Sequence, residues 1–162
     1  MNIKKLVIYA LFAAYAVLAL NLLFFMRDSM WRFYTYKEYF PRNTNFVPFR
    51  TVIEFAGYIR SHDKVYGDMS ADNLLGNLAV FMPAGIIFPA VWKRQRSSRV
   101  FLLTVSAVII GVELIQLLTM CGSCDIDDYI LNISGALLGF ALSGLKPVQR
   151  LTYTDVGHEK GE

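Results

Sequence analysis

Four long apolar runs limit what this chain can fold into more than any other feature. They cover residues 6–26, 74–92, 100–120 and 126–145, where the last run includes a short polar start at the interface. A bilayer core of about 30 Å is crossed by roughly 20 helical residues, because each residue adds about 1.5 Å. Only 18% of the residues are charged, against about 25% in soluble domains. The sequence therefore predicts an all-α membrane protein with four transmembrane helices in a single domain, residues 1–162.

Composition also excludes several classes of protein. The long apolar runs and the low charge argue against a soluble single-core enzyme and against a disordered tail. No basic stripe alternates with stacking aromatic residues, so nucleic acid is not an expected partner. Cys121 and Cys124 form one CxxC in a short loop. Without a second pair or a histidine, they favour a local disulfide or two free thiols over a zinc or redox site.

The first apolar run combines features of a signal peptide and of a membrane helix. Lys4 and Lys5 precede it, and small residues at positions 14, 16 and 19 offer cleavage-like positions. The apolar region of a signal peptide has about 7–15 residues, whereas this run continues from position 6 to position 26. We therefore expect it to be retained as a transmembrane helix.

The distribution of basic residues predicts the orientation. Loop 93–99 has four basic residues in seven positions, and loop 121–125 has none. Cytoplasmic loops are enriched in Lys and Arg, so we expect loop 93–99 and both the N- and C-termini in the cytoplasm. Loop 27–73 then lies outside, with seven basic residues diluted over 47 positions and accompanied by six acidic ones.

The long first loop, residues 27–73, has two features of its own. Six aromatic residues fall within ten positions, a density typical of the membrane–water interface. Further on, apolar residues recur at helical spacing, which predicts a short amphipathic helix, either lying on the outer leaflet or packed on the ends of the transmembrane helices. The aromatic residues are Trp31, Phe33, Tyr34, Tyr36, Tyr39 and Phe40, and the apolar face is Phe49, Val52, Ile53, Ala56 and Ile59, opposite Arg50, Glu54 and Arg60.

Polar residues in and beside the apolar runs converge on one end of the predicted bundle. Successive transmembrane helices alternate in direction, so the start of the second, the end of the third and the start of the fourth share one side of the membrane. Polar groups in a bilayer are costly and mark candidate functional sites. We therefore expect a polar chamber that opens towards the outer surface. Its members are Asn73, Asn77, Glu113, Gln116, Asp125, Asp127, Asp128 and Asn132.

Small residues and one proline shape the helices around this chamber. Gly135 and Gly139 continue the helix face of Asn132, and such a stripe permits close helix contact, either within the bundle or in a dimer. Pro83 is expected to kink the second helix and to free a carbonyl. The mixed face of the second helix consists of Asn77, Phe81, Met82 and Gly85.

The residue types in the chamber permit a small range of chemistry. Glu113 is the candidate for general acid or base catalysis, although no nucleophile is evident. No cofactor is expected except a divalent cation, for which Asp125 and Asp128 are weak candidates. The same groups suit hydrogen bonding to the hydroxyls or amides of a lipid-linked ligand. A structural role is the alternative, in which buried polar groups pair with one another and Asp125 caps the fourth helix.

Four motifs follow one another along the chain. They are Asn45-x-x-Pro48-Phe49, Asn77-x-x-x-Phe81-x-Pro83-x-Gly85, Glu113-x-x-Gln116 and Asp125-x-x-Asp128-x-x-x-Asn132-x-x-Gly135. In this order they resemble the VanZ-like membrane family, over residues 45–145. The chain departs from the family in the turn before the aspartates, where many members have an Arg or a small polar residue and this chain has the CxxC.

The resemblance implies a multi-pass protein of the bacterial cytoplasmic membrane, in a Gram-positive cell. The founding member of the family is associated with resistance to teicoplanin, a lipoglycopeptide antibiotic that binds lipid-linked cell-wall precursors. The residues implied in ligand binding are Asn77, Glu113, Gln116, Asp125, Asp128 and Asn132.

Three functions compete at this point. The first is a binding protein that engages a membrane lipid, a lipid-linked cell-wall precursor or the glycopeptide antibiotic at the outer leaflet. The second is an intramembrane enzyme that modifies the same class of lipid, with Glu113 as the acid or base and an aspartate pair holding Mg²⁺. The third is a small transporter or flippase, which is disfavoured because transport sites usually lie near the midplane of the membrane.

Overall fold

The computed structural model describes residues 3–26, 34–61 and 64–153, and this part of the chain is almost entirely helical. Three helical segments are long and apolar enough to cross a membrane: Ile3–Phe25, Tyr66–Val91 and Ser98–Leu118. A fourth span is formed if Ile126–Ser143 and Lys146–Thr152 count together, although the chain bends by 89° between them. The prediction of an all-α, multi-pass membrane protein is confirmed.

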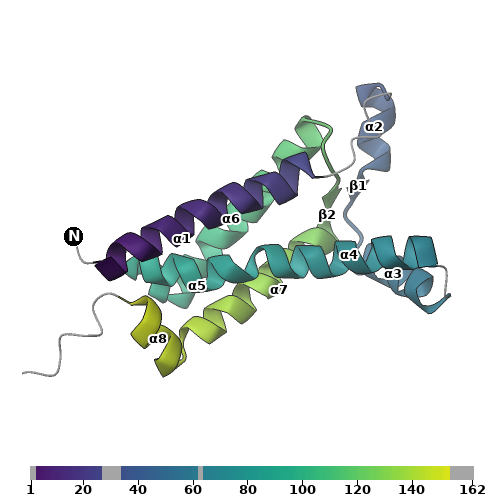
Figure 1. The fold of residues 1–162 in the computed structure, drawn as a ribbon. Coiled ribbons are helices and arrows are strands. Elements are labelled where there is room, and N and C mark those ends of the chain that lie inside the picture. Colours follow the sequence, from purple (N-terminus) through teal and green to yellow (C-terminus); the bar gives the residue numbers. More distant parts are fainter. Residues whose placement is uncertain (1–2, 27–33, 62–63, 154–162) are drawn as a thin grey trace, which may run out of the picture.

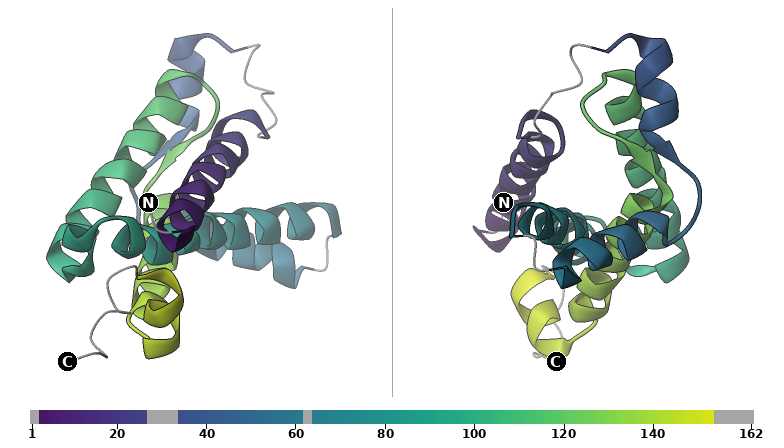
Figure 2. Two further views of the ribbon diagram at one scale, coloured as in Figure 1. Left: turned by 60° about the vertical axis from the view of Figure 1, so that its left-hand side comes forward. Right: turned by 90° about the vertical axis from the view of Figure 1, so that its right-hand side faces the viewer.

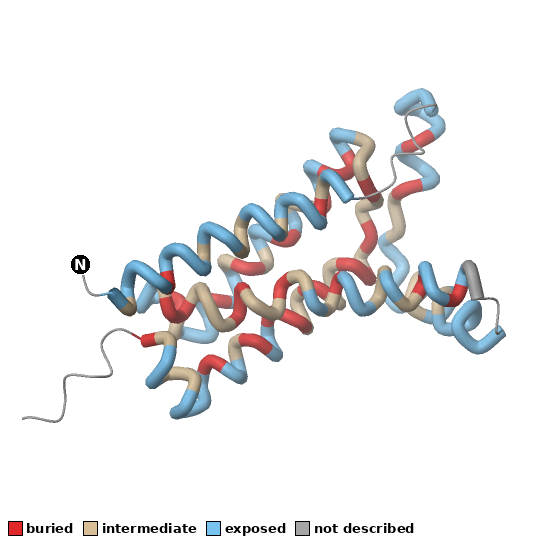
Figure 3. Tube along the Cα trace, viewed as in Figure 1, coloured by how far each residue is buried: buried red, intermediate tan, exposed pale blue. Residues whose placement is uncertain are grey.

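The first span consists of α1 (Ile3–Leu20), which continues without a break into one widened turn, η1 (Asn21–Phe25). Helix α1 packs against α5 (Met82–Val91). Most of its remaining surface is exposed and apolar, as Figure 3 shows, which suits a helix that faces lipid.

The second span is built from two helices, α4 (Lys64–Val80) and α5, with a break at Phe81. The break lies two residues before the expected kink at Pro83. Pro83 falls in the first turn of α5, where the amide that proline lacks would have no helical partner. The hydroxyl of Tyr15 donates a hydrogen bond of 3.0 Å to the carbonyl of Val80, so a carbonyl at the break is satisfied by α1.

Helix α4 begins ten residues before position 74, where hydropathy places the start of the second span. Its first turns are polar, and they are covered by α3 (Arg50–Arg60), which packs along them. The rings of Tyr58 and Tyr66 meet across this pair at 5.8 Å. Figures 1 and 2 show α3 and the beginning of α4 extending sideways from the other helices.

The predicted short helix in the first loop therefore exists, and none of its residues is buried. Its placement on a membrane surface stays a prediction. The aromatic segment before it is described from Tyr34 onwards, so Trp31 and Phe33 lie outside the described residues. Helix α2 (Tyr36–Arg42) begins with a capping box in which the Glu38 carboxylate accepts from the backbone and hydroxyl of Thr35.

The second half of the chain begins with η3 (Lys93–Arg96) and α6 (Ser98–Leu118). A turn then leads to α7 (Ile126–Ser143) and to the short α8 (Lys146–Thr152). Two short strands, β1 (Thr44–Asn45) and β2 (Cys124–Asp125), pair in parallel and tie the first loop to the start of α7.

Helix α8 lies at the same end of the molecule as the start of α1, as Figure 1 shows. The ammonium of Lys4 donates to the carbonyls of Arg150 and Tyr153, at 2.7 and 2.6 Å. The guanidinium of Arg96 lies 3.8 Å from the centroid of the Tyr153 ring. The described ends of the chain and the loop between α5 and α6 therefore share one side of the bundle, and the cytoplasmic placement of that side stays a prediction.

A seam of small residues brings the second span and α7 into backbone contact. An added Cβ on Gly135 would lie 1.8 Å from the carbonyl oxygen of Leu78, and one on Gly139 would lie 2.0 Å from that of Met82. On the facing helix, a Cβ on Gly85 would lie 2.2 Å from the carbonyl oxygen of Ala136. The glycine stripe is thus used inside the bundle.

Candidate functional site

The polar residues that the sequence assigns to one chamber lie at one end of the bundle, where α4, α6 and α7 lie beside η1; all of them are buried except Asn73, which is half-buried. Asn77 on α4 donates from Nδ2 to the carboxylate of Asp128 on α7 and, at 3.3 Å, to Oδ1 of Asn73 one turn earlier. The polar face of α4, formed by Asn73 and Asn77, therefore contacts the polar face of α7 at Asp128.

Gln116 connects α6 to the widened turn of the first span. Its Nε2 donates a hydrogen bond of 2.8 Å to the carbonyl of Leu23, which lies in the π-helical stretch η1. A π-helical turn shifts the register of the backbone hydrogen bonds, and such turns are frequent at functional sites. The amide of Gln116 therefore fixes the end of η1 beside the buried polar residues.

Two buried amides in this region keep hydrogen-bonding groups without a partner. Asn132 is 1% exposed, and neither its Nδ2 nor its Oδ1 has a partner among the described residues. Gln116 is 0% exposed, and its Oε1 is likewise without one. Nearly all buried polar groups in proteins are paired with protein or with water, so three such atoms on two neighbouring helices need an explanation.

Glu113 is buried and lies on the wall of a cavity of about 480 Å³ between α2, α6 and the start of α7. Apolar side chains form most of this wall, among them Phe40, Leu117 and Tyr129. Burial raises the pKa of the Cys124 thiol. The negative charges of Glu113, Asp125 and Asp128 raise it further. Both cysteines are free thiols in the structure, which is the second of the two predicted alternatives.

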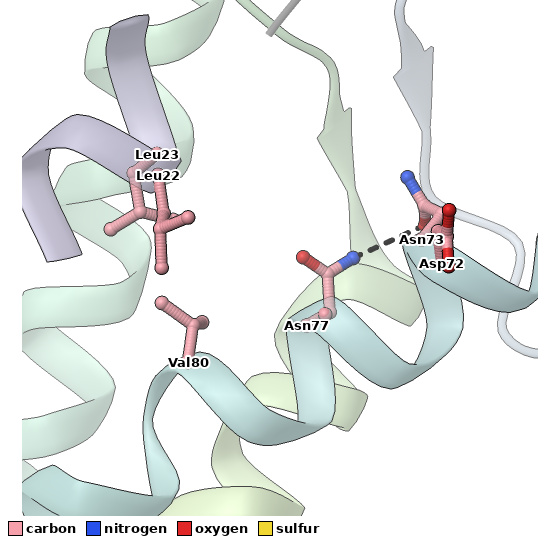
Figure 4. Close-up of a pocket in the computed structure, with 7 residues that line it drawn as sticks. Leu22, Leu23, Asp72, Asn73, Asn77 and Val80 are labelled. Carbon is pink, nitrogen blue, oxygen red and sulfur yellow. Dashed lines mark hydrogen bonds between the residues drawn. The ribbon is translucent and has the colours of Figure 1, made fainter. Parts of the chain in front are cut away.

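A second cavity, of about 190 Å³, separates η1 from α4 (Figure 4). Its η1 side is apolar, with Leu22 and Leu23, and its α4 side is polar, with Asp72, Asn73 and Asn77. In Figure 4 the amide nitrogen of Asn77 points to Asn73 and its oxygen points away from Asn73, towards the side of the leucines. The polar end of the bundle is therefore hollow on this side.

Asp125 is engaged within the protein. It is the N-cap of α7, and its Oδ1 accepts the backbone N–H of Asp127 at 2.8 Å, as the structural alternative predicts. The same oxygen accepts from Asn45 at 3.1 Å, and Oδ2 accepts from the hydroxyl of Thr51 at 2.6 Å. Both oxygens thus hold the first loop.

Asp127 has a role that the sequence analysis does not assign to it. Its carboxylate, fully buried, accepts three backbone N–H groups: Phe49 at 2.5 Å on Oδ1, and Thr51 at 2.8 Å and Val52 at 3.1 Å on Oδ2. These amides belong to the N-cap and first turn of α3, which have no partner inside their own helix. A carboxylate of one helix therefore caps another helix.

The first-loop motif shapes the chain for this contact. Asn45 pairs in the short sheet with Asp125, and its side chain also reaches Thr51 at 3.2 Å. Phe49 adopts a left-handed conformation with φ 64°, which turns its N–H and those that follow towards Asp127. Asn45, Pro48 and Phe49 therefore form the connection that docks α3, and they do not line either of the two cavities described above.

Tyr39 is a further residue whose role differs from the expected one. It is predicted as part of an interfacial aromatic segment, but its side chain is fully buried and its hydroxyl donates to the carbonyl of Gly122 in the CxxC turn. The hydroxyl of Tyr36 donates to the carbonyl of Leu118 at 3.1 Å. Helix α2 thus packs on the end of α6, and a tyrosine-rich sequence gives no signal for these particular acceptors.

Within the part of the chain that the structure describes, no three acidic, His or Cys side chains are grouped so as to hold a metal ion. Asp125 and Asp128 both accept hydrogen bonds from side chains of the first loop or α4. The divalent cation therefore stays a prediction from the sequence alone.

The family model described as VanZ/LLP1 matches residues 12–146, most of the chain. The chain belongs to the VanZ/LLP1 family. The matched segment runs from the middle of α1 to the first residue of α8 and includes every motif of the candidate site. Neither a curated protein nor a solved structure matches the chain. This VanZ-like protein is thus a multi-pass membrane protein of the cell envelope.

Proposed function

We propose that this VanZ-like protein binds the polar part of a lipid-linked cell-wall precursor, or of a lipoglycopeptide antibiotic, at its buried amides and lowers susceptibility to teicoplanin-type drugs. The observation that carries the proposal is Asn132, a buried side chain on a family motif whose donor and acceptor both lack a partner. A ligand with hydroxyl or amide groups satisfies both at once.

The shape of the surrounding surface supports an amphiphilic ligand. Glu113 and Asp125 lie at the edge of the larger cavity, and the rest of its wall is apolar, so a lipid chain would fit beside a polar head. Phe40 of α2 and Phe46 of the first loop line this cavity, and α2 lies at the opposite end of the molecule from the start of α1 (Figure 1). With the termini in the cytoplasm, the ligand would enter from the outer leaflet.

We expect Asn132→Leu to lose drug protection without losing stability. Leucine has a similar volume and removes two unpaired buried polar atoms, each of which costs about 1–3 kcal/mol. The thermal unfolding midpoint should stay the same or rise. In a sensitive Gram-positive host, the wild type should raise the inhibitory concentration of teicoplanin but not of vancomycin, and Asn132→Leu should abolish that increase.

Ser134→Ala on the same helix is the matched control, because the Ser134 hydroxyl bonds only to the carbonyl of Ile130 in its own helix, at 2.6 Å. It should protect as well as the wild type. If a correctly inserted wild type gives no protection, the antibiotic branch of the proposal is wrong. If a purified lipid-linked precursor then fails to raise the unfolding midpoint of the detergent-solubilised protein, the precursor branch is wrong too.

An intramembrane enzyme is the second candidate, and one observation favours it: the buried Glu113 lies at a cavity with an apolar wall. A carboxyl group on the wall of such a cavity can act as a general acid or base on a molecule bound there. Glu113 thus lines the cavity and also belongs to a family motif.

Glu113→Gln distinguishes the two candidates. The amide keeps the shape and can still form hydrogen bonds, so a binding protein should keep at least about half of its protection. An enzyme should lose activity by 10²-fold or more, the usual size of an acid–base contribution. The measurement is drug susceptibility at equal protein level, checked by immunoblot, together with thin-layer analysis of radiolabelled membrane lipids.

A further inference from the structure

A third cavity, of about 680 Å³, lies at the opposite end of the bundle from the candidate site. It lies between α5 and α6, and residues of η3 line one end of it. Val100, Thr104 and Val108 form its wall on α6, one residue per helical turn, and Phe88 and Trp92 form the facing wall on α5. Its apolar part is about 12 Å deep, at 1.5 Å for each residue of α6.

The facing wall is held in place by aromatic contacts. The ring of Trp92 packs edge-on against Phe88 at 5.6 Å and against Phe12 of α1 at 5.1 Å. Because three rings from two helices support one another, the cavity does not depend on a bound molecule to stay open. The walls are suited to a hydrocarbon chain.

The mouth of this cavity is basic. Lys93 and Arg94 line it, and among the described residues no acidic side chain does. Both residues follow the last turn of α5, at the level where a transmembrane helix leaves the hydrocarbon core. Basic pockets between transmembrane helices at this level bind the phosphate of anionic lipids.

A buried amide completes the mouth. Gln95 also lines the cavity and is 9% exposed. Its Nε2 donates to the hydroxyl of Thr104 at 3.0 Å, which directs its Oε1 elsewhere, and that oxygen has no partner among the described residues. This cavity thus has two cations and one buried acceptor without a partner among the described residues in its lining, a combination that suits a ligand with both a negative charge and a hydroxyl donor.

We propose that this cavity is a binding site for an anionic phospholipid with a hydroxyl-bearing headgroup, of which phosphatidylglycerol is the simplest. Lys93 and Arg94 bind the phosphate, Oε1 of Gln95 accepts a glycerol hydroxyl, and one acyl chain lies between α5 and α6. The site is separate from the family motifs and does not depend on the function proposed for them. A zwitterionic lipid would bring an ammonium against the two cations, and phosphatidic acid has no headgroup hydroxyl for Gln95.

The test uses the purified full-length chain in a neutral detergent and measures its unfolding midpoint with added lipid. Phosphatidylglycerol should raise the midpoint by roughly 5 °C at saturation, and phosphatidylcholine should not. Lys93→Gln/Arg94→Gln should remove most of that shift. The matched control is Lys146→Gln/Arg150→Gln, which removes two cations from α8 at the same end of the bundle but outside the cavity, and it should keep the shift.

Gln95→Leu tests the headgroup. Each variant is compared with its own lipid-free midpoint, so a loss of basal stability does not affect the result. This variant should bind phosphatidylglycerol no better than phosphatidic acid, whereas the wild type should prefer phosphatidylglycerol.

Three results would overturn the proposal. The first is an equal shift with phosphatidylcholine, which would indicate general lipid solvation. The second is an equal loss in the α8 control, which would indicate attraction to the whole basic face. The third is an equal shift with inorganic phosphate alone, which would make the site a phosphate site without a lipid.

Discussion

Gly135→Ala is expected to prevent the stable packing of α7 on the second span. The added Cβ would lie 1.8 Å from the carbonyl oxygen of Leu78, and that oxygen belongs to a helix backbone that cannot rotate away. The two helices would then have to move apart at this position or along the whole seam. The seam has no spare room further along either, since an added Cβ on Gly139 would lie 2.0 Å from the carbonyl oxygen of Met82. We expect a loss of at least about 3 kcal/mol of stability, the upper range for overpacking a core.

The measurement is the thermal unfolding midpoint in detergent, with the yield of monodisperse protein from membranes. Gly111→Ala is the matched control, because an added Cβ at this position of α6 meets nothing within 4 Å. It should leave the midpoint unchanged or raise it, since alanine favours a helix over glycine by about 1 kcal/mol. Normal yield and stability of Gly135→Ala would show that the seam is looser than the structure has it.

Asp127→Asn should release α3 from the bundle. The carboxylate now accepts three backbone N–H groups, and an asparagine would place an NH₂ against at least one of them. Each buried backbone N–H that loses its acceptor costs about 1–3 kcal/mol. Because α3 packs on the first turns of α4, we expect those turns to open as well.

Hydrogen exchange gives the most direct measurement. The amides of Phe49, Thr51 and Val52 should exchange at least about 100-fold faster in the variant, and α6 should keep its protection. Asp68→Asn is the control, since Asp68 is an exposed acid on α4. If the three amides stay protected in Asp127→Asn, the carboxylate is not the group that holds them.

The apolar runs predict the long helices well where lipid faces most of the helix. The third run, 100–120, differs from α6 by two residues at each end. The second run fails at its start, because hydropathy treats the polar residues before position 74 as loop. They are helical since α3 covers them, and that contact is made with a segment outside the run.

In the candidate site, too, local sequence patterns predict some contacts and contacts with distant segments decide the others. Helix direction and i,i+4 spacing predict that Asn77 and Asp128 approach each other, and they form a hydrogen bond. The spacing does not distinguish Asp125 and Asp127 from Asp128, since all three begin the same helix. Their roles differ because the first loop supplies donors to two of them and α4 supplies a donor to the third.

The sequence by itself determined the membrane class, the family and the end of the bundle where the polar residues gather. These follow from local quantities, namely the length of apolar runs, helical periodicity and the order of motifs. Only the tertiary structure decided which polar groups are paired and which have no partner among the described residues. That outcome depends on acceptors and donors from distant segments, such as the carbonyl of Leu23 for Gln116 and the amides of α3 for Asp127. Asn132 stands out because neither its Nδ2 nor its Oδ1 has a hydrogen-bond partner among the described residues.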